Sequence, residues 1–155
     1  MSVFQVRLLL PGEGEVVRSL MREYLSELGL SFDPARLDAD LVDPVNYYSP
    51  PRAAFFLAVA PGGEPVGTVA VRPLTGDTCE LKRMYIRPAY RGQGLGRRLL
   101  DTALAFARQA GYQCMKLDSR PDLTAALGLY RKSGFRPCPD YNGNQRAGVF
   151  LEREL

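Results

Sequence analysis

The sequence predicts a mixed α/β (α+β) fold in which a mostly antiparallel sheet of about six to seven strands is flanked by about four helices. Two observations predict this class. Residues 79–118 run in the order strand, helix, strand, which predicts one parallel, right-handed crossover. The other predicted strands follow each other through short turns, which is typical of antiparallel neighbours. A chain of 155 residues without a linker or an internal repeat is expected to form one domain over residues 1–155.

The first third of the chain is predicted to hold one strand and two helices. Residues 4–10 are β-rich enough for a strand, and residues 13–28 carry apolar side chains at helical spacing. Gly29 is expected to end this first helix. Residues 33–41 open with an Asp-Pro pair that is typical of an N-cap and a first-turn proline, so we expect a second, short helix there. Residues 42–51 are rich in proline and are expected to be irregular.

A β-hairpin is predicted next. Residues 54–60 form an apolar run and residues 66–72 form a second strand, with a turn at 61–64 between them. A further turn at 75–78 leads into a central strand that begins at Cys79.

The central strand shows a break in its alternation. Apolar residues fall at Cys79 and Leu81 and then at Met84 and Ile86, so the two-residue period slips by one position. A slip reverses the buried face of a strand unless an extra residue is inserted as a β-bulge. A bulge leaves a backbone N–H unpaired, and such a group can polarise a carbonyl oxygen of a ligand. A central strand that is covered on both faces is the alternative explanation.

The second half of the chain is predicted to alternate helices and strands. Apolar side chains line one face of a helix from about Leu95 to Ala110. The elements expected after it are a strand near residues 115–118, a short helix over 125–133, and an antiparallel pair formed by 135–141 and 149–154.

A segment with three glycines joins the central strand to the following helix. Gly92, Gly94 and Gly96 let the backbone adopt conformations closed to other residues and approach a ligand closely. The helix that begins at about Leu95 offers free N–H groups and the positive end of its dipole, which favour a phosphate or pyrophosphate. The neighbouring arginines add positive charge, so we expect an anion site.

Three other interpretations of this loop can be compared with the anion site. A Rossmann dinucleotide site requires G-x-G-x-x-G, and Arg97 stands where the third glycine would be. The G-x-x-x-x-G-K-(S/T) pattern of a Walker loop does not occur in the chain. A glycine-rich turn without a ligand stays open as the structural alternative, although arginines flank the start of the helix.

Three segments resemble characteristic segments of the GNAT acetyltransferase superfamily. Arg91–Gly96 fit the pattern (Q/R)-x-x-G-x-(G/A), which wraps the pyrophosphate of acetyl-CoA in that family. The preceding CELKRMYIRP, from Cys79 to Pro88, resembles the family's fourth strand, and ALGLYRKSGF, from Ala126 to Phe135, resembles its second characteristic segment. Their order and spacing, over roughly half of the chain, make the resemblance specific. It implies a GNAT-like sheet and acetyl-CoA as co-substrate.

The resemblance also implies which residues bind the coenzyme. In the family, the fourth strand pairs with the pantetheine arm, a backbone N–H in or beside Ile86 faces the acetyl carbonyl, and the glycine loop holds the pyrophosphate. The residues expected to bind acetyl-CoA are therefore Met84, Tyr85, Ile86, Arg91, Gly92, Gln93, Gly94, Leu95, Gly96 and Arg97. Many relatives carry asparagine where this chain has Leu123, which puts one polar contact to the coenzyme in doubt.

Two residues are expected to move protons. Glu80 lies eleven residues before Arg91, the offset at which some family members place a catalytic glutamate. It is the candidate base for an amine whose pKa is about 10.4. The alternative is a structural carboxylate paired with Lys82 or an arginine. By the same resemblance Tyr130 is the candidate acid for the departing thiolate, and a core tyrosine is its alternative.

Composition excludes several kinds of site. The chain has no histidine, so neither a Ser-His nor a Cys-His nucleophilic system can form. Its three cysteines are widely separated and indicate free thiols in a reducing compartment rather than a metal site. A net charge of +3 with dispersed basic residues does not indicate a nucleic-acid partner. No signal peptide or membrane-length apolar run is recognisable, so we expect a cytoplasmic protein without a membrane partner.

The predicted function is acetyl-CoA-dependent N-acetyl transfer by direct attack in a ternary complex, to an amine of a small molecule or peptide and without a metal. The alternative is a non-catalytic acyl-CoA-binding or sensing module. The acceptor is expected between residues 28–51 and the last hairpin near Tyr141. Four aspartates in residues 33–43 would favour a cationic acceptor, unless they are helix caps and solvated acids. The sequence leaves open which amine is used and whether a homodimer forms.

Overall fold

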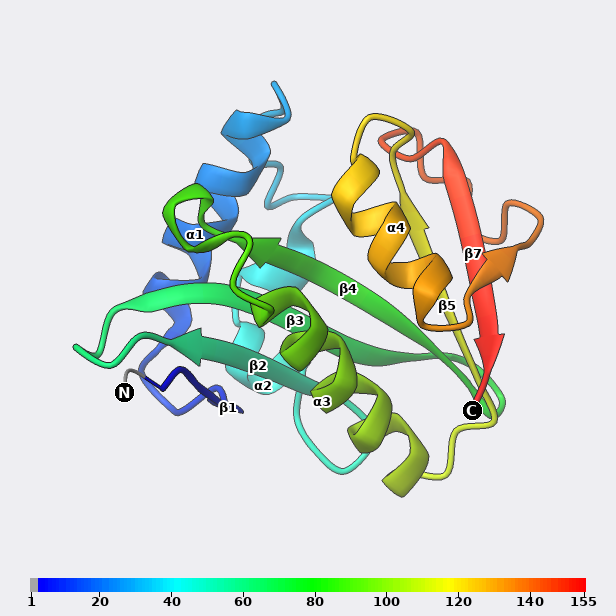
Figure 1. The fold of residues 1–155 in the computed structure, drawn as a ribbon, viewed down its shortest axis with the longest axis horizontal. Helices are drawn as coiled ribbons and strands as arrows, with labels where there is room; N and C mark the ends of the chain where they lie inside the picture. The colour runs from blue at the N-terminus through cyan, green and yellow to red at the C-terminus, as the bar shows by residue number, and fades with distance from the viewer. Residues whose placement is uncertain (1–2) are drawn as a thin grey trace.

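The computed structural model describes residues 3–155, which form one sheet with helices on both faces (Figure 1). The sheet has seven strands in the order β1-β2-β3-β4-β5-β7-β6, and all neighbours are antiparallel except β4 and β5. The strands are β1 (Gln5–Leu8), β2 (Ala54–Val59), β3 (Pro65–Thr75), β4 (Thr78–Ile86), β5 (Cys114–Ser119), β6 (Arg136–Pro137) and β7 (Val149–Glu154). The helices are α1 (Gly14–Glu27), α2 (Pro44–Tyr47), α3 (Leu95–Gln109) and α4 (Thr124–Lys132), with short 3-10 helices η1 (Ala39–Leu41) and η2 (Pro88–Tyr90). The predicted fold class, with its one parallel crossover, is confirmed.

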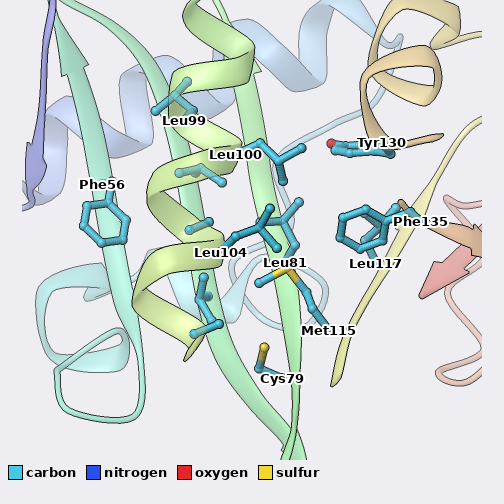
Figure 2. Packing of buried hydrophobic residues seen from close by; sticks show 14 of the residues in the cluster. Phe56, Cys79, Leu81, Leu99, Leu100, Leu104, Met115, Leu117, Tyr130 and Phe135 are labelled. Carbon is cyan, nitrogen blue, oxygen red and sulfur yellow. The ribbon is translucent and has the colours of Figure 1, made fainter. Parts of the chain in front are cut away.

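Two hydrophobic cores lie on opposite faces of the sheet. On one face the apolar sides of α3 and α4 pack on the strands, as Figure 2 shows for Leu81, Leu100 and Leu117. On the other face α1 packs on the sheet through a cluster that includes Met21 and Phe55. The sheet is therefore the middle layer, covered at its centre on both sides. None of the described helices is both long and apolar enough to span a membrane.

The central strand β4 contains the predicted bulge. Thr68 of β3 pairs with Tyr85, whereas Ala70 pairs with Lys82, so three steps along β4 oppose two along β3. The bulge includes Arg83, the one residue other than glycine in the described chain with a positive φ, at +60°. Because one residue is inserted, the apolar side chains before and after the bulge pack on the same face. The bulge interpretation is therefore confirmed, and the strand is also buried on both faces before the bulge.

Strands β4 and β5 separate after a short parallel ladder. Within residues 3–155 they pair only where Thr78–Glu80 lie beside Cys114–Lys116. Beyond this ladder β4 continues along β3, whereas β5 continues along β7 as far as Ser119. Figure 1 shows the two strands pointing in different directions at their C-terminal ends. The sheet therefore opens in its middle.

The structure corrects two predictions for the segment between α1 and β2. The helix predicted over 33–41 is wrong, because this segment forms turns and only η1 is helical. The Asp38 side chain accepts a hydrogen bond from the N–H of Asp33 at 2.8 Å, which closes the turn. The segment predicted to be irregular contains α2, because Asp43 caps it and Pro44 occupies its first turn. The Asp-Pro signal therefore predicts a helix correctly at the second of its two occurrences.

The strand predicted over 135–141 is also too long, since only β6 pairs with β7. Pro137 and Pro139 lack the N–H groups that a longer ladder would need. The Asp140 side chain then accepts two backbone N–H bonds, which fold the following residues into a turn. The chain between β6 and β7 is therefore mostly loop.

Candidate active site

The glycine loop has the backbone geometry that its sequence predicts. Gly92 and Gly94 have φ angles of +78° and +79°, and α3 begins immediately after Gly94. A Cβ atom at either glycine would meet nothing within 4 Å, so the backbone angle rather than crowding requires glycine there. Gly96 differs, because a Cβ atom would lie 3.2 Å from Ile86 Cδ1 and 3.3 Å from Leu129 Cδ2. The third glycine therefore allows α3 to pack closely on β4 and α4.

Residues 92–97 present a run of successive backbone N–H groups without acceptors. No hydrogen bond in the described part of the chain uses these groups as donors. The next N–H, that of Arg98, donates to the carbonyl of Gly94 at 3.2 Å and starts the helical pattern. Free N–H groups and the positive end of a helix dipole favour a bound anion. The loop therefore has the donor arrangement that a pyrophosphate requires.

The arginines beside this loop are partly neutralised. Arg91 donates from Nε to the carbonyl of Ile86 at 2.8 Å and pairs with Glu27 of α1 at 2.8 Å. Arg97 pairs with Asp101 one turn further along α3, at 3.3 Å. Because carboxylates balance both charges, the backbone N–H groups are the main feature of the predicted anion site.

A cavity of about 540 Å³ lies where β4 and β5 separate. Met84 of β4, Leu117 of β5 and Tyr130 of α4 line it. Side chains from α1, from the segment around η1 and from residues 142–147 complete its walls. The predicted acceptor region, residues 28–51 with the last hairpin, therefore does border this cavity. Its volume is within the range of small-molecule sites.

The three β4 residues predicted to bind the coenzyme lie on different surfaces. Met84 lines the cavity. Tyr85 is buried on the α1 side, where its ring lies 5.2 Å from that of Tyr24. Ile86 packs on the opposite face with the α3 core. All three residues follow Arg83, in the part of β4 that does not pair with β5. The feature that they have in common is therefore a backbone without a partner on β5, rather than the direction of their side chains.

Tyr130 is both a core residue and a cavity residue. Its ring packs edge-on against Phe135, with the centroids 5.9 Å apart, and Figure 2 shows it extending toward Leu100 of α3. It also lines the cavity. Burial raises the pKa of Tyr130 above its ordinary value, so its hydroxyl group stays protonated at neutral pH.

Glu80 is held by three hydrogen bonds and is 1% exposed. Arg72 donates from Nε to Oε1 at 2.9 Å. The Tyr141 hydroxyl and the Asn142 amide donate to Oε2 at 2.6 Å and 3.2 Å. Burial, reinforced by the charge of Glu80, raises the pKa of Tyr141, so this phenol remains a donor. Glu80 therefore has the arginine partner that its structural interpretation requires, and its role as a base stays a prediction.

Asp118 is a cavity residue that no sequence pattern singles out. Lys82 Nζ lies 3.6 Å from its carboxylate, and the amides of Asn142 and Asn144 donate to it at 2.6 Å and 3.1 Å. Burial alone would raise the pKa of Asp118, but the charge of Lys82 and these hydrogen bonds lower it below its ordinary value. The two asparagines come from the loop before β7, so only the folded chain brings this cluster together. Asn142 also joins Asp118 to Glu80.

A buried ion cluster connects the bulge of β4 to two segments that line the cavity, the segment around η1 and the loop before β7. Arg83 lies 3.1 Å from Asp38 through Nη1 and 2.5 Å from Asp40 through Nη2. Arg146, from the loop before β7, lies 2.8 Å from Asp38. Burial alone would raise the pKa of Asp38 and that of Asp40, but the arginines lower both below their ordinary values. Both aspartates are therefore ionised and neutralised by arginine.

This cluster corrects the interpretation of the acidic segment. Asp38 and Asp40 are not solvated acids, because they are buried beneath arginines. Asp38 precedes η1, but its side chain makes no capping hydrogen bond to that helix. Their charge is balanced, so they supply no net attraction for a cationic acceptor. Asp43 caps α2, which agrees with the helix-cap alternative for this residue.

Comparisons with known proteins agree with this geometry. A sequence model described as the acetyltransferase (GNAT) family matches residues 17–135. An uncharacterized N-acetyltransferase of Schizosaccharomyces pombe is 35% identical over 145 residues, which cover 93% of this chain and 89% of the relative. The uncharacterized N-acetyltransferase YjgM of Escherichia coli is 35% identical over 152 residues, covering 92% of this chain and 90% of YjgM.

Solved structures show the same fold. An acetyltransferase of the GNAT family from Staphylococcus aureus superposes with a TM-score of 0.89 over 98% of this chain and 99% of its own, at 19% identity. The PaiA N-acetyltransferase of Thermoplasma acidophilum, solved in complex with coenzyme A, gives a TM-score of 0.73 over 99% of both chains at 17% identity. The general reaction of the family is acetyl transfer from acetyl-CoA. The chain therefore belongs to the GNAT acetyltransferase family and is an acyltransferase.

Proposed function

We propose that the protein transfers the acetyl group of acetyl-CoA to an amine of a small molecule or peptide, by direct attack in a ternary complex. The observation that carries this proposal is the cavity at the opening between β4 and β5, which Tyr130 lines. The glycine loop follows β4 in the chain, and its free N–H groups suit a pyrophosphate. Acetyl-CoA and the amine acceptor would therefore meet at the opening between β4 and β5.

The chain's residues fit the coenzyme along the C-terminal part of β4 and in the glycine loop that follows it. The N–H groups between Gly92 and Arg97 would hold the pyrophosphate, with space beside Gly92 and Gly94 for its close approach. The backbone of Met84–Ile86 would pair with the pantetheine arm, because this part of β4 has no neighbour on β5. Leu123 also lines the cavity but has no polar side chain to offer the coenzyme.

Tyr130 would act as the general acid. Its phenol stays protonated at neutral pH, because burial raises its pKa. A proton supplied to the leaving thiolate, whose pKa is about 8.5 by analogy with cysteine, would promote its departure. General acid catalysis of this kind contributes roughly 10²-fold or more to a rate.

Glu80 is proposed as the base, acting through a relay. Its carboxylate does not line the cavity, but Arg72 and Asn142, which hydrogen-bond to it, both do. A proton from the amine would therefore reach Glu80 through a water molecule rather than directly. If Glu80 is structural instead, it acts by orienting Arg72 and Asn142.

The cysteines favour direct attack over an acyl-enzyme. Burial raises the pKa of Cys79 to about 12 and also raises the pKa of Cys114 and Cys138. Their thiols are therefore mostly protonated and weakly nucleophilic at neutral pH. None of the three lines the cavity.

The test is release of coenzyme thiol when the protein and acetyl-CoA are mixed with a panel of amines. Tyr130→Phe is expected to lower kcat roughly 10²-fold while the Kd for coenzyme A stays within twofold. Glu80→Gln is expected to lower kcat/KM. Tyr112→Phe is the control, because this buried tyrosine bonds to the carbonyl of Arg52 and does not line the cavity.

Two outcomes would contradict parts of this proposal. If coenzyme A binds, no amine releases thiol, and neither Tyr130→Phe nor Glu80→Gln changes anything, the protein is a non-catalytic binding module. If amines are acetylated and Glu80→Gln leaves kcat/KM unchanged, Glu80 is not the base.

A further inference from the structure

We propose that the amine acceptor also carries a carboxylate, and that Arg72 together with Tyr47 binds this carboxylate. The inference rests on the proposed acetyl transfer and adds the chemical class of its acceptor. It is argued from the charged side chains that line the cavity and from those of their hydrogen-bond donors that have no acceptor in the described chain.

More cations than carboxylates line the cavity. The acidic lining residues are Asp40 and Asp118, both largely buried and bonded to basic partners. Glu80 and Asp38 are 1% and 0% exposed and do not line the cavity. The basic lining residues are Arg36, Arg72, Lys82, Arg83, Arg120 and Arg146. A ligand therefore meets guanidinium and ammonium groups first, which favours an anionic group on the acceptor.

Arg72 is a cavity-lining arginine with a donor to spare. Its Nε donates to Glu80 and its Nη1 to the Tyr47 hydroxyl, both at 2.9 Å, and in residues 3–155 its Nη2 donates to nothing. By contrast, Arg83 uses all three of its nitrogens on Asp38, Asp40 and a carbonyl. The Arg72 side chain is 27% exposed, so its free edge is accessible. A guanidinium edge of this kind matches a carboxylate.

Tyr47 supplies the second donor. Its hydroxyl oxygen accepts from Arg72, so its own proton is available to a ligand. The side chain lines the cavity and is 48% exposed, although it is a large aromatic group. The capped helix α2 and the packing of its ring on Tyr48, with centroids 4.8 Å apart, hold it in place. Arg72 and Tyr47 together therefore form a two-donor site for one carboxylate.

The position of this site orients the acceptor. Arg72 pairs with Glu80 across β3 and β4, and the bulge at Arg83 lies three residues further along β4, about 10 Å away. A carboxylate at Arg72 would leave the amine directed toward the bulge and Asp118, where β4 and β5 separate. Acceptors whose amine and carboxylate are several atoms apart would span this distance best.

The test compares acids with uncharged analogues of the same shape. Acetylation of α-amino acids, β-alanine, 4-aminobutyrate, 5-aminopentanoate and lysine would be measured beside the primary amide of each compound. At least one acid is expected to have a kcat/KM at least tenfold above that of its own amide. Arg72→Lys and Tyr47→Phe are expected to reduce that ratio at least fivefold.

A second arginine–tyrosine pair provides the matched control. The Arg52 guanidinium lies 4.6 Å from the centre of the Tyr112 ring, and neither residue lines the cavity. Arg52→Lys and Tyr112→Phe should leave the ratio of acid to amide unchanged. Tyr47→Phe keeps the inference testable even if Arg72→Lys disturbs Glu80, because Tyr47 does not touch Glu80.

The outcomes separate this inference from the proposed function. Acetylation of amides at the same rate as acids, or faster, would overturn the carboxylate site while leaving acetyl transfer intact. If no compound is acetylated, the site is tested by melting temperature, and the proposed function is decided by the wider panel of amines. An acid that stabilises the wild type more than its amide does, but not the Tyr47→Phe variant, would support the site. Equal stabilisation by the acid and the amide would overturn it.

Discussion

The glycine loop and the acceptor side of the cavity are built on opposite principles. The loop uses backbone N–H groups from six neighbouring residues, 92–97, and two of its glycines, Gly92 and Gly94, are exposed. The acceptor side uses charged side chains from three distant parts of the chain, joined by the buried cluster of Arg83, Asp38, Asp40 and Arg146. The coenzyme site therefore depends on the local sequence of one loop, whereas the acceptor wall depends on the whole tertiary structure.

The difference also concerns where the stability lies. At the loop, the ion pair of Arg97 with Asp101 is more than half exposed on both sides and contributes little to stability. The pair of Arg83 with Asp38 is almost completely buried, so removing one partner would leave an uncompensated charge in the interior. Arginine substitutions should therefore affect the two regions very differently.

The largest effect is expected when Arg83 is replaced. Arg83→Met should lower the free energy of unfolding by about 3–5 kcal/mol, because Asp38 and Asp40 lose their main partner inside the protein. Arg97→Met is the matched change at the loop and should cost about 0–1 kcal/mol. Urea denaturation followed by circular dichroism measures both values. Equal losses in the two variants would show that the buried cluster does not stabilise the fold.

An intermediate effect is expected when a glycine of the loop receives a side chain. Gly94→Ala should raise the Kd for coenzyme A roughly tenfold and lower the unfolding free energy by about 1–2 kcal/mol, because φ is +79° there. Gly62→Ala is the control, since that glycine has open space and no positive φ. Isothermal titration calorimetry measures the affinity. Unchanged affinity in Gly94→Ala would argue against coenzyme binding by this loop.

The smallest effect on stability is expected when the pH is lowered. The pKa values of Asp38 and Asp40 are lowered in the folded protein, so their contribution to stability is complete above the unfolded value of about 3.9. It is lost as the pH falls from there through the lower folded pKa values. The melting temperature should therefore decrease below about pH 4, and less steeply in Asp40→Asn than in the wild type. A parallel decrease in the two proteins would show that Asp40 is not responsible.

The local features of the fold were predictable from the sequence. The start of α3 after Gly94 and the bulge of β4 follow from glycine spacing and from a slipped alternation within a few residues. Prediction failed where side chains act at a distance. Asp33 begins no helix, because the Asp38 side chain closes a turn there and then joins a cluster with Arg83 and Arg146.

The candidate site divides in the same way. Tyr130 lies in a recognisable segment and does line the cavity, whereas Arg72, Asp118 and Asn142 belong to no motif. From the sequence alone, Glu80 could be either the base or a structural carboxylate paired with Lys82 or an arginine. Only the folded sheet places Arg72 beside it.

By itself, the sequence determined the α/β class, the crossover and the glycine loop, since each depends on contacts or periodicities within short stretches of chain. The tertiary structure alone decided which charges face the cavity and which lie behind them. The reason is physical: a buried carboxylate is stabilised by whichever cation the fold brings to it, and here that cation can come from more than 100 residues away, as Arg146 does for Asp38.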